Sequence, residues 1–243
     1  KFIKTNLSVT NIKLIKIEKM VSENKRILIY GDSNSWGYLD DGNGERFQRR
    51  WPIEMADHLS QTLSVDLIEE CLPARTTNLS DPVLGSSFNG ELTLEAILLS
   101  HQPIDHVLIM LGTNDLKAQF DRNINDIVNA IIGLAKITKS TPAGRGGWFS
   151  DDVPDVSIIC PLVIGQRAND PSWERADEWA GAYEKSLLLS SSLQKACNLA
   201  GINMIDGNEF GSSSKHDPIH WNQENHQLFG QKFAKAIQPF LLD

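Results

Sequence analysis

The stretch RILIYGDSNSWG, residues 26–37, decides the fold class. Its first half is a continuous apolar run that ends in Gly31, which is typical of a strand buried on both faces of a parallel sheet. Its second half is polar, and a helix is expected to start there. A buried strand that passes at once into a helix is the first unit of an α/β fold.

The same alternation of short apolar runs and longer amphipathic segments continues along the chain. The expected strands are 26–31, 65–70, 106–112, 156–161 and 202–206, and the expected helices are roughly 51–62, 91–100, 122–139, 173–200 and 223–239. Parallel strands joined through helices take right-handed crossovers. The sequence therefore predicts a three-layer α/β/α sandwich with a five-stranded parallel sheet. Two loops, 71–90 and 140–155, are long enough to shape a site.

Composition favours one compact domain. The chain has 243 residues, of which 41% are hydrophobic and 22% are charged, as in ordinary globular proteins that bury a substantial core. The net charge of −8 offers no positive surface to phosphate backbones or anionic lipid. No apolar stretch reaches the roughly 20 residues that cross a bilayer. Neither nucleic acid nor membrane is expected as a partner.

Residues 1–24 are expected to stand apart from a single domain that spans 25–243. Lys and Asn interrupt every apolar run in this segment before it reaches the length of a signal-peptide core, so no export signal is visible. Two interpretations stay open. The segment is an artificial or upstream-translated extension before Met20, or it is a flexible arm that packs on a neighbouring subunit.

The cysteines indicate a reducing compartment, and the protein is expected in the cytoplasm. They are odd in number, widely spaced and without a CxxC pattern, which predicts neither a disulfide framework nor a cysteine zinc site. We expect buried thiols and no cofactor. The three are Cys71, Cys160 and Cys197.

Polar segments follow the predicted strands. In a parallel sheet, ligands bind at the carboxyl ends of the strands, where the loops diverge. The segments at that edge are GDSNSWG (31–37), CLPARTTN (71–78) and GTNDLK (112–117), with DPIHW (217–221) beyond the last strand. Groups capable of chemistry are therefore expected to converge on one edge.

Ser33 is the candidate nucleophile. A serine hydroxyl needs an adjacent base, usually an imidazole that a carboxylate orients. At the start of a helix, free backbone N–H groups can also stabilise an oxyanion. The alternative is that Ser33 only caps the helix and Asp32 only forms the turn.

Asp217 and His220 are the candidate partners of Ser33. They are separated by i, i+3 in a turn that contains Pro218, so the carboxylate can accept from Nδ1–H while Nε2 faces a nucleophile. One alternative is a capping Asp before the last helix with an incidental surface His. A metal pair of His216 and His220 is the weaker alternative, because a zinc site needs three or four ligands and no HExxH or cysteine cluster supplies them.

Asn114 is a candidate oxyanion donor, because a side-chain amide at a strand's carboxyl end can donate to a carbonyl oxygen as charge develops. Alternatively, GTND is a plain turn whose polar groups bond only to the backbone.

Two groups of polar residues stay outside the catalytic set. A structural hydrogen-bond network explains Arg75, Asp115 and Lys117 as well as substrate contact does. Surface or capping roles suffice for His58, His101, His106 and His226.

Together, GDS, GTND and a late DxxH along a five-stranded α/β chain resemble the SGNH hydrolases, also called the GDSL esterases and lipases. Ser33 matches the family's first block, Asn114 the third, and Asp217 and His220 the fifth. The resemblance runs from about Lys25 to the end, and implies the family's flavodoxin-like fold. It is strongest with bacterial aryl esterases and acyltransferases, through GDSNSWG, IEECLPARTTN and IMLGTNDLK.

The sequence departs from the family pattern at two places. The second block normally supplies a Gly whose N–H joins the oxyanion hole, whereas LPARTT contains no Gly. By resemblance to the aryl esterases, Ala74 provides that N–H. A backbone donor needs no particular side chain if its φ/ψ is allowed. Asn34 stands where many members have Leu, which changes the lining of the site.

The resemblance implies a serine esterase that acts on small-acyl, acetyl-like esters, including aryl esters. Ser33, His220 and Asp217 form the triad, and the oxyanion hole takes the N–H of Ser33, the N–H of Ala74 and the side chain of Asn114. The implied partners are a small ester with water or an alcohol as acceptor. Relatives in this branch form oligomers that bury the entrance, so a homo-oligomer is expected.

Bulky side chains beside the triad are candidates for substrate binding, and they favour small acyl groups and planar or apolar alcohols. They are Trp36, Tyr38, Ile219 and Trp221; ordinary core packing is the alternative for the three aromatic residues. Two other functions stay open. A carbohydrate de-O-acetylase shares the residues and the reaction. A non-catalytic flavodoxin-like binding module shares only the sheet, and the missing Gly-rich phosphate loop counts against it.

Overall fold

Five parallel strands form the sheet of the computed structural model, which describes residues 24–242. The order across the sheet is β2-β1-β3-β4-β5, so the chain reverses direction across the sheet between β1 and β3. Such a switch point is where the loops of an open α/β sheet leave room for a ligand. The strands are β1 (Lys25–Gly31), β2 (Val65–Cys71), β3 (His106–Met110), β4 (Asp155–Cys160) and β5 (Asn203–Asp206).

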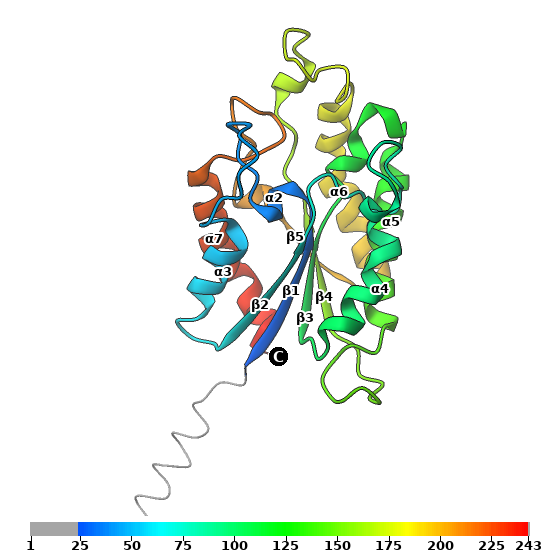
Figure 1. The fold of residues 1–243 in the computed structure, drawn as a ribbon, viewed down its shortest axis with the longest axis vertical. Helices are drawn as coiled ribbons and strands as arrows, with labels where there is room; N and C mark the ends of the chain where they lie inside the picture. Colours follow the sequence, from blue (N-terminus) through cyan, green and yellow to red (C-terminus); the bar gives the residue numbers. More distant parts are fainter. Residues whose placement is uncertain (1–23, 243) are drawn as a thin grey trace, which may run out of the picture.

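Helices cover both faces of the sheet, and the predicted three-layer sandwich is confirmed (Figure 1). One face carries α3 (Trp51–Leu59) and α7 (Gln223–Leu242), and the other carries α4 (Gly90–His101), α5 (Ile124–Ser140) and α6 (Ala182–Ala200). The short helix α2 (Ser33–Trp36) lies at the carboxyl end of β1. The polar end of the stretch 26–37 therefore stands on the ligand-binding edge.

Strand β1 supplies side chains to both halves of the core. Ile27 and Ile29 pack on the side of α3 and α7, whereas Leu28 and Tyr30 pack on the side of the other three helices. All four have no exposed surface. Burying one large apolar side chain contributes about 1.5–3 kcal/mol, which explains why this strand is apolar at every position between its charged start and Gly31.

Most predicted helix boundaries agree with the structure, but the helix expected over 173–200 begins only at Ala182. Residues 173–181 form turns instead, and they bury the indole rings of Trp173 and Trp179. Gly181 has a φ of 75°, in the left-handed region, which an α-helix cannot contain. The prediction was therefore wrong over the first nine residues of this segment.

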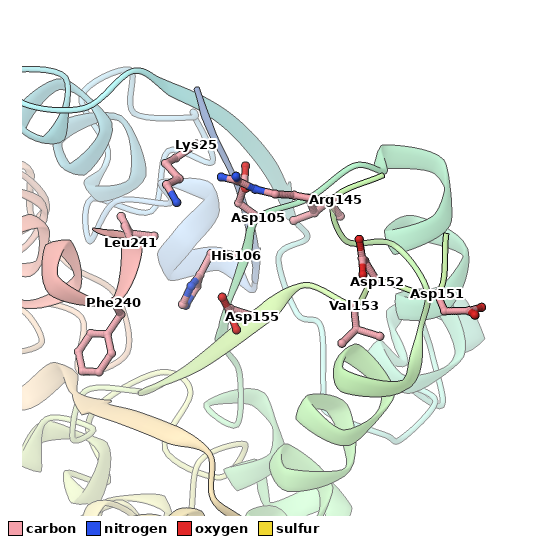
Figure 2. Close-up of a pocket in the computed structure, with 11 residues that line it drawn as sticks. Lys25, Asp105, His106, Arg145, Asp151, Asp152, Val153, Asp155, Phe240 and Leu241 are labelled. Atoms are coloured by element: carbon pink, nitrogen blue, oxygen red, sulfur yellow. The ribbon is translucent and has the colours of Figure 1, made fainter. Parts of the chain in front are cut away.

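The loop 140–155, which the sequence showed to be long enough to shape a site, lies away from the carboxyl edge of the sheet. It precedes β4 and so lies at the opposite edge of the sheet. Its residues Asp151, Asp152 and Val153 line a cavity of about 530 Å³ together with Lys25 and His106, which begin β1 and β3 (Figure 2). Of the two long loops, only 71–90 follows a strand and reaches the candidate site.

Two histidines that were assigned surface or capping roles are instead buried. His106 is 4% exposed and pairs through Nε2 with Ser157 Oγ at 2.8 Å. His226 is 0% exposed and packs against the rings of Phe47 and Trp221. Because burial disfavours the charged imidazole, the pKa of His106 is lowered to about 4 and that of His226 to about 3.

The predicted extension of residues 1–24 lies outside the described residues, apart from Asn24. Within 24–242, none of the helices combines the length and the apolar character that a membrane crossing requires.

Candidate active site

Ser33 is the first residue of α2. Asp32 caps this helix by accepting from the N–H of Asn34 at 3.0 Å, and the helix ends at Gly37, whose φ is 95°. A Cβ on Gly37 would lie 2.9 Å from the side chain of Arg50, so this tight end requires glycine. The short, capped helix holds the Ser33 side chain at the carboxyl edge of β1, where it is 6% exposed.

Asp217 holds its own loop and His220 together. Its Oδ1 accepts from the N–H of Ile219 at 2.8 Å and from the N–H of His220 at 3.3 Å, and its Oδ2 lies 2.6 Å from His220 Nδ1. Burial alone would raise the pKa of Asp217, but these hydrogen bonds outweigh it and hold the pKa below its ordinary value. The carboxylate is therefore ionised at neutral pH.

The structure brings Ser33, His220 and Asp217 into one hydrogen-bonded line. His220 Nε2 lies 3.1 Å from Ser33 Oγ, on the ring edge opposite the 2.6 Å contact with Asp217. The first distance is within the reach that proton transfer between a hydroxyl and an imidazole needs, and the second is a hydrogen bond between the imidazole and the carboxylate. His220 is 7% exposed, so little water competes for its ring.

Asn34 was interpreted as a lining residue, but it links the two loops that carry the line. Its Nδ2 donates to the carbonyl of Ile219 at 3.2 Å, and its side chain is buried. The ring of Tyr38 lies 4.5 Å from the ring of His220 between centroids. On the other side of the loop, Gly165 N–H donates to Pro218 O at 2.8 Å. These contacts fix the position of His220 relative to α2.

The turn after β2 lies beside Ser33. The N–H of Leu72 donates to Gly31 O at 3.1 Å, and Arg75 Nη1 donates to the same carbonyl at 3.2 Å. The Arg75 guanidinium also stacks on Tyr30 at 4.1 Å from the ring centroid, so its role is structural, as the sequence allowed. Between these anchors, Ala74 adopts a φ of 66°, which places a non-glycine residue in the left-handed region.

Asn114 follows β3 and faces the same turn. Its Nδ2 donates to the carbonyl of Arg75 at 3.1 Å, and its second amide N–H remains free to donate elsewhere. Within residues 24–242, the backbone N–H groups of Ser33 and Ala74 have no hydrogen-bond acceptor. Three unused donors therefore come from three neighbouring loops.

The strained φ of Ala74 predicts that Ala74→Gly stabilises the protein. The left-handed conformation costs an L-residue about 1–2 kcal/mol, and glycine avoids this cost but loses about 0.4–1 kcal/mol through its more flexible unfolded chain. We expect the free energy of unfolding in urea to rise by about 0.5–1 kcal/mol, while the backbone N–H at this position is unchanged. Ala74→Val, the control, should lower it, and a destabilised Ala74→Gly would contradict the strained turn.

The expected substrate-binding residues divide into two groups. Trp36, the last residue of α2, and Tyr38 are partly exposed, and the Arg46 guanidinium lies 5.5 Å from the Trp36 ring. Ile219 and Trp221 are only 4% and 1% exposed and belong to the core. Trp221 packs 4.7 Å from the ring of Phe229 between centroids. These two residues therefore support the loop of His220 through core packing, and their contact with a substrate stays a prediction.

Sequence reasoning missed the segment 162–181, which follows β4 on the ligand-binding edge. Its Glu178 forms an ion pair with Lys117 at 3.1 Å, and its backbone carbonyl accepts from the N–H of Ala118 at 2.8 Å. The segment lines a polar cavity of about 390 Å³ that also borders Asp217. Among the residues around this cavity are Tyr38, Asp40, Arg167, Trp173, Arg175 and Asp217. The sequence did contain one signal for this segment, because it directly follows the predicted strand 156–161 and therefore starts at the ligand-binding edge.

Comparison with known proteins adds to this geometry. The model of the GDSL-like lipase and acylhydrolase family matches residues 27–233. The solved native aryl esterase of M. smegmatis is 31% identical, with 88% of this chain and 99% of that chain covered and a TM-score of 0.79. The carbohydrate acetylesterase Est24 of Sinorhizobium meliloti is 29% identical, with 89% and 99% covered and a TM-score of 0.80. No curated protein sequence matches this chain.

Proposed function

The chain belongs to the GDSL-like lipase and acylhydrolase family and is a carboxylic ester hydrolase, and on this premise we propose that it is a serine esterase for small-acyl esters. The observation that carries the proposal is the line from Ser33 Oγ through His220 to Asp217, with contacts of 3.1 and 2.6 Å. A non-catalytic binding module would have no use for a hydroxyl, an imidazole and a carboxylate in this order.

The reaction proceeds in two steps. Ser33 Oγ attacks the ester carbonyl carbon while His220 Nε2 takes the hydroxyl proton. The intermediate then expels the alcohol, which receives that proton from His220, and the acyl group stays on Ser33. Water attacks the acyl-enzyme in the same way, releases the carboxylic acid and restores the serine. Asp217 holds the tautomer of His220 and stabilises its charged form throughout.

Three donors receive the oxyanion. They are the N–H of Ser33, the N–H of Ala74 and the free amide N–H of Asn114, and each comes from a different loop at the switch point between β1 and β3. Preorganised donors of this kind stabilise the charge that develops on the carbonyl oxygen.

The acyl side of the site favours small groups. Ser33 and His220 are only 6% and 7% exposed, so a long acyl chain finds little open surface beside them. On the alcohol side, the polar cavity supports a second candidate, a carbohydrate de-O-acetylase. Aromatic rings such as Trp173 next to charged side chains such as Arg175 and Asp40 suit a ligand with many hydroxyl groups.

A panel of esters tests both candidates. The proposal predicts that kcat/KM for p-nitrophenyl acetate exceeds that for p-nitrophenyl octanoate by more than about tenfold, because the longer chain has no room. Acetylated monosaccharides and phenyl acetate are compared in the same assay to rank sugar against aryl alcohols. A preference for octanoate would overturn the small-acyl assignment, and no turnover of any ester would overturn the esterase itself.

Acyl transfer to alcohols is part of the proposal. Limited access of water to the acyl-enzyme lets an alcohol compete better than its concentration suggests. With excess alcohol present, we expect more ester product than the molar ratio of alcohol to water gives. A ratio of ester product to acid product that is no higher than the molar ratio of alcohol to water would indicate a hydrolase without acyltransferase activity.

Two expectations about the protein's setting also remain proposals. A homo-oligomer is supported by the exposed apolar side chains of Val83 and Leu84 in the loop 71–90, which are 86% and 49% exposed. Light scattering that finds only the monomer mass would contradict the homo-oligomer.

A cytoplasmic location is supported by free cysteines at 71, 160 and 197, and recovery of the protein only outside the cell would contradict it.

A further inference from the structure

The proposed oxyanion hole depends on the spacing between two loops. Ala74 lies in the turn after β2, and Asn114 lies in the turn after β3. β1 lies between these two strands in the sheet, so no sheet hydrogen bond joins their ends. Donors to an oxyanion must be held close to their working positions, because a shift of about 1 Å can cost about 10²-fold in rate. Something outside the sheet must therefore set the distance between the loops.

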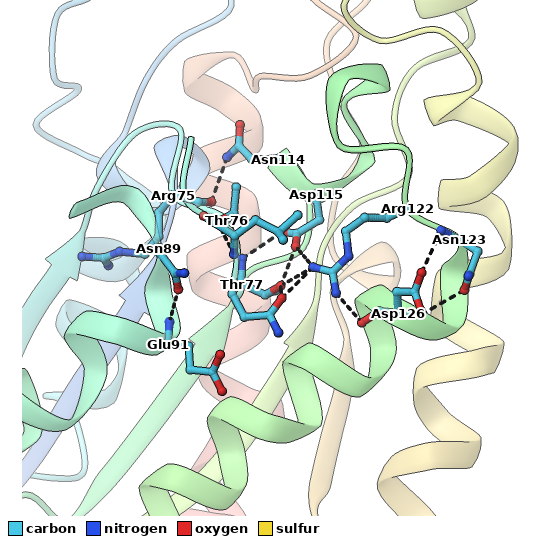
Figure 3. Close-up of polar contacts among 12 residues, drawn as sticks. Arg75, Thr76, Thr77, Asn89, Glu91, Asn114, Asp115, Arg122, Asn123 and Asp126 are labelled. Atoms are coloured by element: carbon cyan, nitrogen blue, oxygen red, sulfur yellow. Dashed lines mark hydrogen bonds and ion pairs between the residues drawn. The ribbon is translucent and has the colours of Figure 1, made fainter. Parts of the chain in front are cut away.

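Asp115 makes the connection. Its side chain is 0% exposed, its Oδ2 accepts from the N–H of Thr77 at 2.9 Å, and its Oδ1 accepts from Thr77 Oγ1 at 2.5 Å (Figure 3). The preceding residue, Asn114, donates to Arg75 O at 3.1 Å. Two adjacent residues of one loop thus hold two nearby residues of the other, on the C-terminal side of Ala74.

Arg122 closes the network behind Asp115. Its Nη1 lies 2.6 Å from Asp115 Oδ1, 3.1 Å from Thr77 Oγ1 and 2.9 Å from Asn78 Oδ1 (Figure 3). Its Nη2 donates to the carbonyl of Asp126 at 2.7 Å, which anchors the guanidinium to α5. Burial raises the pKa of Asp115, and the hydrogen bonds of Thr77 and the charge of Arg122 offset this only in part.

A buried ion pair of this kind is a weak source of stability, since apolar side chains of similar volume often stabilise as well or better. The pair instead fixes the relative position of the two loops, because its hydrogen bonds form only at defined distances and angles. A strained backbone conformation persists only where several contacts of the surrounding structure hold the residue in it. Ala74, with its φ of 66°, is such a residue, and the network secures the chain three residues after it.

We propose that Asp115 is a positioning residue for the oxyanion hole, acting through Thr77 on the turn that carries the N–H of Ala74. This role rests on the proposed function. Asp115 touches no reacting atom. Its carboxylate sets where the donors of Ala74 and Asn114 stand, and Arg122 holds that carboxylate in place.

The first test is Asp115→Asn. The new amide cannot accept from the N–H of Thr77 and Thr77 Oγ1 with both of its polar atoms, so the turn shifts. The amount of active protein is measured as the fraction of Ser33 that a fluorophosphonate labels. Normalised to this amount, kcat for p-nitrophenyl acetate is expected to fall by about 10²-fold, with KM little changed. The inhibition constant of phenylboronic acid, which forms an oxyanion-like adduct on serine, should rise in proportion to the loss in kcat/KM. If Asp115 had only a structural role, Asp115→Asn would lower the melting temperature but leave kcat per labelled Ser33 and the inhibition constant of phenylboronic acid unchanged.

A matched pair at Thr77 keeps the test informative if Asp115→Asn does not fold. Thr77→Val removes the hydroxyl donor at nearly constant volume, and Thr77→Ser retains it. We expect kcat to fall by about tenfold in Thr77→Val and to be restored in Thr77→Ser. Equal kcat in the two variants would overturn the positioning role.

The outcomes separate this inference from the proposed function. A wild-type protein that hydrolyses no ester and takes no label removes both. An active wild type whose Asp115→Asn variant keeps kcat within about threefold removes only the positioning role and leaves the esterase in place.

Discussion

Ser33→Ala is expected to lower kcat for p-nitrophenyl acetate by roughly 10⁴–10⁶-fold. Without Oγ there is no atom 3.1 Å from His220 Nε2 to attack the ester, and no acyl-enzyme forms. The residual rate comes from the oxyanion donors and from substrate binding, which the substitution leaves in place. Steady-state turnover with purified protein measures the loss.

Ser35→Ala is the matched control. Ser35 lies in the same short helix, is 0% exposed, and its Oγ has no hydrogen-bond partner within residues 24–242. Removing an unsatisfied buried hydroxyl leaves no partner unpaired, so this variant should fold and turn over normally. If Ser33→Ala retained more than about a hundredth of wild-type kcat, Ser33 would not be the nucleophile.

Asp217→Asn is expected to lower kcat by about 10⁴-fold while the fold is preserved. The carboxylate accepts from His220 Nδ1 at 2.6 Å, whereas an asparagine amide can turn its N–H toward the ring and favour the wrong tautomer. Nε2 then carries the proton and cannot take one from Ser33. The low pKa of Asp217 means that the wild-type carboxylate is charged over the whole neutral range, so the titration of Asp217 itself should add no pH dependence to wild-type kcat between pH 6 and pH 8.

Asp177→Asn provides the matched change of charge. Asp177 is exposed in the same segment that lines the polar cavity, and its substitution removes one negative charge without touching His220. Kinetics for the two variants are compared at equal concentrations of folded protein, measured by circular dichroism. A loss below about tenfold in Asp217→Asn would show that another group orients His220.

The fold was predictable from the sequence because the strands of a doubly covered sheet are apolar at nearly every position. RILIYG shows this pattern, and its residues Ile27 to Tyr30 alternate between the two halves of the core. The start of α6 was not predictable from periodicity. It depends on the left-handed Gly181 and on the burial of Trp179, both of which are set by tertiary packing.

The meeting of Ser33, Asp217 and His220 was also predictable, since parallel strands bring their following loops to one edge. Their roles in the reaction stay a proposal. The supporting contacts were not predictable, because they join residues far apart in the chain. The bond from Asn34 to Ile219 O spans 185 positions, and a bond from Asp40 N–H to Trp221 O joins the same two parts of the chain. The positive φ of Ala74 likewise has no sequence signal, because alanine seldom adopts it.

The central claim is that the hydroxyl of Ser33 is the group that His220 activates. Labelling the wild-type protein with a fluorophosphonate, digesting it and locating the adduct by mass spectrometry tests this directly, because such reagents react with activated serines. We expect one adduct per chain, on the peptide that contains Ser33. An adduct on a different serine, or none on folded protein, would contradict it.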